Sequence, residues 1–142
     1  MSKNIILSVI CGSLILSGCT LYVPPKTTQR VTPVEPLGSK EICIVENPKV
    51  RPHFLEVYQQ VMERKGYTIT ILEPNETVVS CPITSTYVAN WGFNGFAAFL
   101  RHVTINIFKD GYLKGEVYYE NQGNFVNGEE KLTELLNQLF PF

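Results

Sequence analysis

The sequence lacks the short motifs that identify the best-known catalytic chemistries. It contains no P-loop, no G-x-G-x-x-G turn, no H-E-x-x-H pair and no G-x-S-x-G elbow. Histidine is scarce, because His53 and His102 are the only two and lie far apart in the chain. An isolated histidine is usually a surface or core residue. We therefore expect a protein that is not an enzyme and that holds no metal and no cofactor.

An excess of charge of one sign is also missing. The chain has 12 Lys and Arg against 13 Asp and Glu, a formal net charge of −1. No basic patch of the kind that binds nucleic acid is visible, and neither is an acidic tail. The hydrophobic content of 44% is ordinary for a globular domain, so the composition excludes a wholly disordered chain.

What the sequence does contain is a secretory signal at its start. Lys3 precedes an apolar run over residues 5–16, and the small residues Ser17 and Gly18 follow. This order is typical of a cleaved signal, and the run is shorter than the ~20 residues that span a bilayer. The sequence Leu16-Ser17-Gly18-Cys19 is typical of a bacterial lipobox. We expect residues 1–18 to be removed and Cys19 to carry lipid; the alternative is an ordinary signal cut, with Cys19 left as a thiol.

A lipid on Cys19 would anchor the protein to a membrane, its expected partner. Multiple acyl chains give durable attachment, whereas a single chain binds only marginally. Thr20 follows the cysteine, in the position where lipoproteins retained at the inner membrane usually carry Asp. By resemblance to that sorting rule, we expect the outer membrane of the bacterial envelope as the location.

The remaining cysteines form an even pair. Cys11 leaves with the signal and Cys19 carries lipid, so Cys43 and Cys81 are left in an oxidising compartment. Such pairs normally form a disulfide, and this one would contribute about 4 kcal/mol in the chain-entropy model. A two-cysteine metal site is the competing interpretation, which the wide spacing disfavours.

Proline concentrates between the anchor and the first apolar segment, at positions 24, 25, 33 and 36. Pro-rich chain is extended and semi-rigid. We therefore interpret residues 19–40 as a tether and residues 41–142 as the folded domain. The alternative is that part of the tether packs on the domain as an arm.

The domain sequence alternates strand and helix patterns. Residues 41–46 and 67–72 are β-branched strands on either side of a helix whose apolar face is Phe54, Val57, Tyr58 and Val61, which predicts a right-handed βαβ unit. Strands follow near 83–91, 103–108 and 112–119. A second helix is capped by Asn127 and has the apolar face Leu132, Leu135, Leu136 and Leu139. The predicted fold is α/β (α+β): a two-layer mixed sheet, order βαβ-βββ-α, with both helices on one face.

The turn between the last two strands can be predicted in detail. A two-residue loop at Asp110-Gly111 would set Ile105 opposite Glu116, whereas a three-residue loop that includes Lys109 pairs apolar residues with one another. Register follows the apolar face. We therefore predict the three-residue loop, with Gly111 at positive φ in a G1 bulge. The core face would consist of Val103, Ile105 and Ile107.

Aromatic residues supply the candidate binding surface, which we assign to Trp91, Phe93, Phe96 and Tyr118. Exposed aromatics mark interfaces, although core packing is the alternative. Glu116 and Glu120 flank Tyr118 and could act with His102 in a hydrolase, but solvated edge charges explain them more simply. The favoured function is a non-catalytic envelope module that binds another protein or a glycan. The alternatives are a small hydrolase and a self-assembling structural lipoprotein.

Several segments resemble a family of small, uncharacterised outer-membrane lipoproteins of proteobacteria. The resemblance spans most of residues 41–141 and rests on segments 44–51, 81–87, 89–91, 109–111, 129–131 and 139–141. It implies a periplasmic α/β domain at the outer membrane, with a bridge between Cys43 and Cys81. It implies no particular activity.

Overall fold

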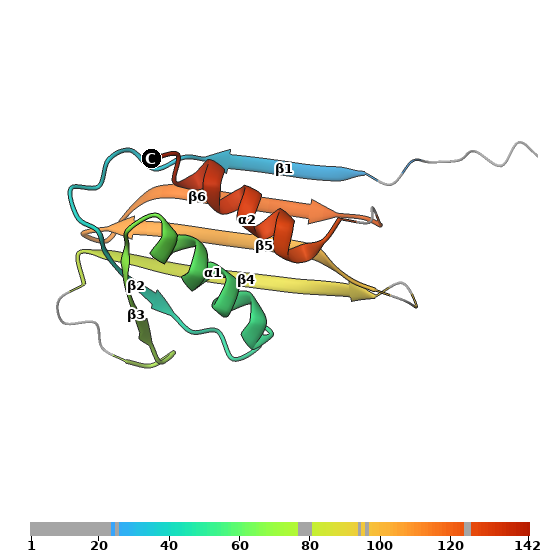
Figure 1. Ribbon diagram of the computed structural model, residues 1–142, viewed down its shortest axis with the longest axis horizontal. Coiled ribbons are helices and arrows are strands. Elements are labelled where there is room, and N and C mark those ends of the chain that lie inside the picture. The colour runs from blue at the N-terminus through green and yellow to red at the C-terminus, as the bar shows by residue number, and fades with distance from the viewer. Residues whose placement is uncertain (1–23, 25, 77–80, 94, 96, 124–125) are drawn as a thin grey trace, which may run out of the picture.

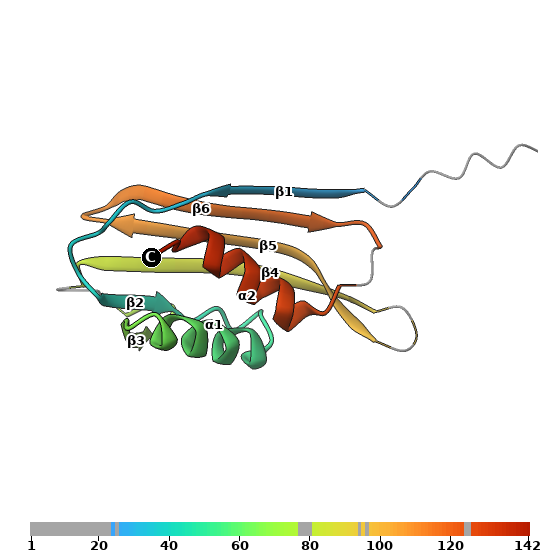
Figure 2. The ribbon, with the colours of Figure 1, turned by 45° about the horizontal axis from the view of Figure 1, so that its top comes forward.

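The computed structural model describes residues 24, 26–76, 81–93, 95, 97–123 and 126–142. The predicted signal peptide and Cys19 lie outside these residues. The described chain forms one six-stranded mixed sheet, order β1-β6-β5-β4-β2-β3, with both helices on one face (Figures 1 and 2). The elements are β1 (Thr27–Thr32), β2 (Glu41–Val45), α1 (Pro52–Arg64), β3 (Thr68–Leu72), β4 (Ile83–Phe93), β5 (Ala98–Lys109), β6 (Tyr112–Asn121) and α2 (Gly128–Leu139).

The predicted two-layer α+β fold is confirmed. Strand β2 pairs in parallel with both β3 and β4, and α1 connects β2 to β3. Helix α1 begins with Pro52, whose missing N–H costs nothing in a first turn, and Gly66 follows it at φ 82°. Neither described helix combines the length and apolar character that crossing a membrane requires.

The core lies between the sheet and the two helices. All eight apolar positions predicted for the helix faces are buried, as are Val103, Ile105 and Ile107 on β5. Asn127 caps α2, because its Oδ1 accepts hydrogen bonds from the backbone N–H groups of Glu129 and Glu130. A buried hydrogen bond of 2.7 Å joins the Tyr58 hydroxyl to Ser85 Oγ and so ties α1 to β4.

The predicted disulfide is present. Cys43 on β2 is bonded to Cys81, just before β4, with 6.1 Å between the Cα atoms. The bridge crosslinks the parallel pair β2–β4, whose register includes only Cys43↔Thr84 and Ile44↔Ser85. It therefore strengthens the shortest pairing in the sheet.

The predicted three-residue loop is wrong. Lys109 pairs with Tyr112, and Asp110 and Gly111 have φ values of 53° and 80°, which is a two-residue type I′ turn. The type I′ turn matches the strand twist, and an extra residue at Lys114 then restores the apolar register as a β-bulge. Ile107 consequently lies opposite Gly115, and the predicted core face of β5 is correct.

The tether prediction for residues 19–40 is wrong for its described second half. Strand β1 pairs antiparallel with β6 at the edge of the sheet. After it, Val34 and Leu37 are 2% and 5% exposed, and the Val34 N–H donates to the Leu139 carbonyl at 2.9 Å. Pro24, Pro33 and Pro36 lie outside the strand, where they remove no ladder hydrogen bond. The alternative of an arm packed on the domain is therefore correct here.

Candidate functional site

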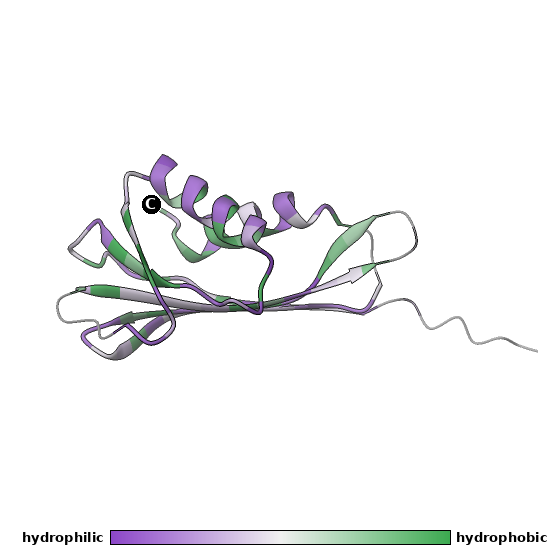
Figure 3. Cartoon of the chain, turned by 90° about the horizontal axis from the view of Figure 1, so that it is seen from below, coloured by the Kyte–Doolittle hydropathy of each residue, from purple (hydrophilic) through white to green (hydrophobic). Residues whose placement is uncertain are grey.

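The sheet has one covered face and one open face. Helices α1 and α2 lie together on one side, as Figure 3 shows edge-on, and no described helix covers the other side of β1, β6, β5 and β4. Register partners in adjacent strands present their side chains to the same face. We use the name open face for three rows across these strands: Thr28, Glu120, His102, Asn90; Arg30, Tyr118, Thr104, Val88; and Thr32, Glu116, Asn106, Thr86.

Tyr118 is the centre of the contacts on this face. The Arg30 guanidinium lies 5.1 Å from the centroid of its ring, and the His102 ring meets it edge to face at 5.4 Å. The Tyr118 hydroxyl donates to Glu120 Oε2 at 2.7 Å. His102 Nε2 forms a 3.2 Å hydrogen bond with Thr104 Oγ1. We refer to these five residues as the Tyr118 cluster.

A polar hollow of about 560 Å³ opens beside this cluster. It collects an imidazole, a phenol, a carboxylate, an amide and a guanidinium from three adjacent strands. Such a set offers both donors and acceptors over a small area. The lining residues are Asn90, Trp91, Arg101, His102, Tyr118 and Glu120.

The electrostatics keep Tyr118 protonated. Its hydrogen bond to the Glu120 carboxylate is the main cause that raises the Tyr118 pKa above the ordinary value, with desolvation and the Glu120 charge adding to it. The nearby Arg30 acts in the opposite direction. The phenol is therefore a hydrogen-bond donor at neutral pH, and it engages one oxygen of Glu120.

The three predicted surface aromatics that the structure describes, Trp91, Phe93 and Tyr118, do not form one patch. The ring of Trp91 packs against Gly128 at the start of α2, with the Arg51 guanidinium 5.7 Å from its centroid, so it lies on the helix side. Phe93 is 69% exposed at the end of β4, Tyr118 belongs to the open face, and Phe96 lies outside the described residues. Strand alternation produces this separation, because Trp91 follows Tyr87 and Ala89 on the buried side of β4, whereas Tyr118 belongs to the opposite face of the sheet. Trp91 therefore borders the hollow but is largely a packing residue.

The structure brings together His102, Tyr118 and Glu120, the grouping that the hydrolase alternative required. Glu116 and Glu120 are not edge charges, because β1 continues the sheet beyond β6 and leaves both half-buried. Arg30 was missed because its segment was assigned to the tether. Its β-branched neighbours Thr28, Val31 and Thr32 are typical of a strand and could have indicated β1.

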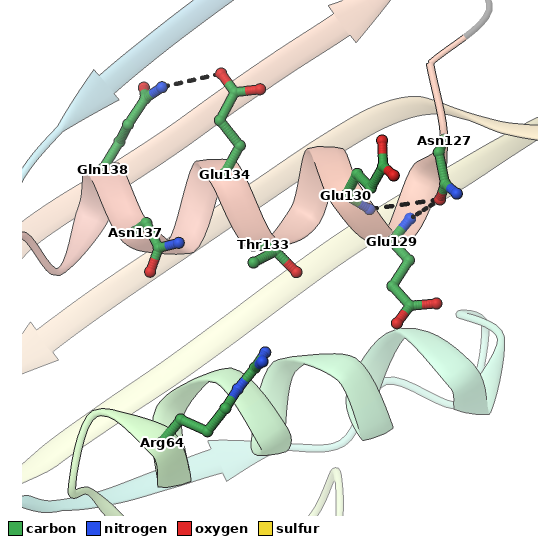
Figure 4. A pocket seen from close by; sticks show the side chains of 8 residues that line it. All are labelled: Arg64, Asn127, Glu129, Glu130, Thr133, Glu134, Asn137 and Gln138. Carbon is green, nitrogen blue, oxygen red and sulfur yellow. Dashed lines mark hydrogen bonds between the residues drawn. The ribbon is translucent and has the colours of Figure 1, made fainter.

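A second hollow lies between the two helices (Figure 4). Its volume is about 760 Å³ and its lining is mostly acidic or amide. These side chains already bond to one another and to the helix: Gln138 Nε2 donates to Glu134 Oε1 at 3.0 Å, and Asn127 caps α2. Because these bonds stabilise α2, the presence of these polar side chains needs no ligand to explain it. The lining residues are Arg64, Asn127, Glu129, Glu130, Thr133, Glu134, Asn137 and Gln138.

His53 lies near this groove, away from the open face. Its ring is 3.2 Å from Glu56 Oε2 and 3.7 Å from Glu129 Oε2, and all three side chains are exposed. Across the residues placed by the structure, no three His, Cys, Asp or Glu side chains gather as metal ligands would.

Comparison with known proteins identifies the class of fold. No protein-family model and no curated protein matches the chain. Among solved structures, it is similar to a point variant of PelC from Paraburkholderia phytofirmans, described as a dodecamer. The TM-score is 0.56 at 12% identity, over 79% of this chain and 94% of that chain. The likeness establishes a shared fold.

Proposed function

We propose that this protein is an outer-membrane lipoprotein that acts as a non-catalytic binding or assembly module through its open face. The observation that carries the proposal is the open face itself: four strands present exposed and half-buried polar side chains that no described helix covers. Val88, 46% exposed, adds apolar area beside the Tyr118 cluster. Interfaces combine an aromatic and arginine centre with a polar rim, which is the composition found here.

The contacts within the cluster favour recognition over catalysis. A catalytic histidine is normally oriented by a third group, such as a carboxylate that bonds to its ring. Here one oxygen of Glu120 accepts from Tyr118, and His102 bonds to a threonine hydroxyl. No ion pair between His102 and Glu120 occurs in the described structure. The side chains hold one another in place, as a pre-organised binding surface requires.

The location follows from the lipobox. In our proposal Cys19 is acylated and the domain lies in the periplasm, at the outer membrane, where the Cys43–Cys81 disulfide is stable. The partner is a second envelope protein or a further copy of this chain. Self-association is supported by the dodecameric state of the similar PelC structure.

The anchor is tested by Cys19→Ser in cells. We expect the variant to leave the membrane fraction and to lack the mass of the acyl chains. Unchanged fractionation and unchanged mass would refute the lipoprotein proposal.

The binding face is tested by photo-crosslinking in the native envelope. A photo-crosslinking amino acid in place of Val88 samples the open face, and one in place of Gln60, exposed on α1, is the matched control. We expect an adduct from position 88 that disappears with Tyr118→Ala, and none from position 60. Adducts of equal yield from both positions, or none, would contradict the proposal. The mass of the adduct separates a second copy from a different protein.

The runner-up function is a hydrolase that uses His102 and Glu120. The convergence of both residues on the 560 Å³ hollow favours it. Chromogenic ester and glycoside substrates test it directly. Turnover that is lost in His102→Ala would favour this enzyme, and we expect no such turnover.

A further inference from the structure

The two ends of the sheet differ in their distance from the anchor. Strand β1 begins at Thr27 opposite Asn121, beside the end of the sheet where β4 and β5 are joined. Figure 2 shows the start of β1 at this same end, and the β5–β6 turn at the opposite end. We call these the anchor end and the far end.

The chain between the anchor and the sheet is short. Cys19 and Thr27 are eight residues apart, which spans at most about 29 Å when fully extended. Strand β5 has 12 residues and is therefore about 40 Å long. A lipid on Cys19 thus holds the anchor end within reach of the bilayer surface, whereas the far end lies a strand length further along the sheet.

The anchor end carries an exposed apolar tip. The Phe93 side chain is 69% exposed, Ala97 and Ala98 are exposed, and the half-buried ring of Phe99 lies over Gly92. Residues 91–100 contain no charged side chain, while Arg101 follows them and Lys26 precedes β1 at the same end of the sheet, both exposed and basic. At the far end, Tyr112 and Leu113 are also exposed, at 71% and 53%, but they adjoin the charged residues Lys109, Asp110 and Lys114 in the hairpin.

We propose that this tip, formed by Phe93, Ala97, Ala98 and Phe99, rests in the lipid interface beside the acylated Cys19. The inference depends on the lipid anchor of the proposed function. Aromatic side chains favour the headgroup region of a bilayer, and nearby Lys and Arg are attracted to anionic headgroups. With the anchor and the tip both on the membrane, the strands stand upright. The open face then points sideways, accessible to a neighbouring protein.

The test places an environment-sensitive fluorophore on a single introduced cysteine. The native cysteines do not compete for the label, because Cys43 and Cys81 are bonded and Cys19 is acylated. Phe93→Cys reports on the tip. Tyr112→Cys is the matched control, since Tyr112 is 71% exposed at the far end. Both labelled full-length lipoproteins are reconstituted into vesicles that contain anionic lipid and spin-labelled lipid as quencher.

We expect blue-shifted emission and strong quenching at position 93, and water-like emission without quenching at position 112. An unquenched label at 93 on acylated, vesicle-bound protein overturns the tip contact while the anchor stands. Equal quenching at both positions refutes the upright orientation and the inference with it. Absence of acyl mass on Cys19 refutes the anchor, and therefore both proposals.

Discussion

A methyl group added at Gly115 tests whether the arm that follows β1 belongs to the folded domain. A Cβ at this position would overlap Val34 Cγ1 and would lie 3.0 Å from Leu139 Cδ1 and 3.1 Å from the Thr32 carbonyl oxygen. Two of these three neighbours belong to β1 and the arm. The backbone φ of Gly115 is not positive, so alanine is otherwise tolerated there.

The sign of the change in unfolding free energy caused by Gly115→Ala shows whether the arm packs on the domain or stays free of it. In a strand without the arm, Gly115→Ala reduces the entropy of the unfolded chain and stabilises by about 0.5–1 kcal/mol. Against a packed arm, overpacking by one methyl costs about 1–3 kcal/mol. We expect net destabilisation of about 1–2 kcal/mol, which lowers the midpoint of thermal unfolding by roughly 4–8 °C for a domain of this size.

The assay is urea unfolding of the mature Cys19→Ser protein, with a double-mutant cycle. Val34→Ala alone should cost about 2 kcal/mol, since Val34 is 2% exposed. In that background Gly115→Ala should be less destabilising, because the Cγ1 overlap is gone while Leu139 and the Thr32 carbonyl remain close. A neutral or stabilising Gly115→Ala would show that the arm does not pack here.

Three further predictions concern stability. Replacing both Cys43 and Cys81 with Ala should cost about 4 kcal/mol in urea unfolding, because the closed loop spans a sequence separation of 38 residues; a loss below about 1 kcal/mol would contradict this. Gly111→Ala should cost about 1 kcal/mol because its φ is 80°, and a neutral result would argue against the type I′ turn. Burial raises the pKa of Tyr58 above 10.0, so its contribution is complete below that pH and is lost as pH rises toward the folded value. Stability should therefore fall in alkali, and less steeply in Tyr58→Phe.

Local patterns were enough to predict most of the fold. Helical spacing identified Phe54 and Leu132 as core residues, and alternation identified Ile105, because burial of apolar area dominates at such positions. The turn illustrates the limit of this reasoning. The register argument predicted the correct buried face of β5 but the wrong loop length. A two-residue turn followed by a bulge at Lys114 also places the apolar residues of the two strands on one face.

The candidate site was predictable only in parts. His102, Tyr118 and Glu120 were each singled out, but their contact depends on the register of β5 and β6, which pairs His102 with Glu120. Arg30 comes from a segment whose prolines suggested a tether. Trp91 shares the buried side of β4 with Tyr87 and Ala89 by ordinary alternation, but only the tertiary structure decided which side of β4 the helices cover.

The sequence by itself determined the predicted export signal, the pairing of the two remaining cysteines, the two amphipathic helices and the apolar face of the sheet. These depend on composition and on the side-chain periodicities of helices (3.6 residues) and strands (2 residues), which a short stretch of sequence is enough to reveal. Only the tertiary structure decided that β1 closes the sheet beside β6, that Tyr118 lies between Arg30 and His102, and which face stays open. Those outcomes depend on contacts between residues far apart in the chain. Arg30 and Tyr118, for example, are 88 positions apart (118 − 30), and no local pattern encodes the energy of their contact.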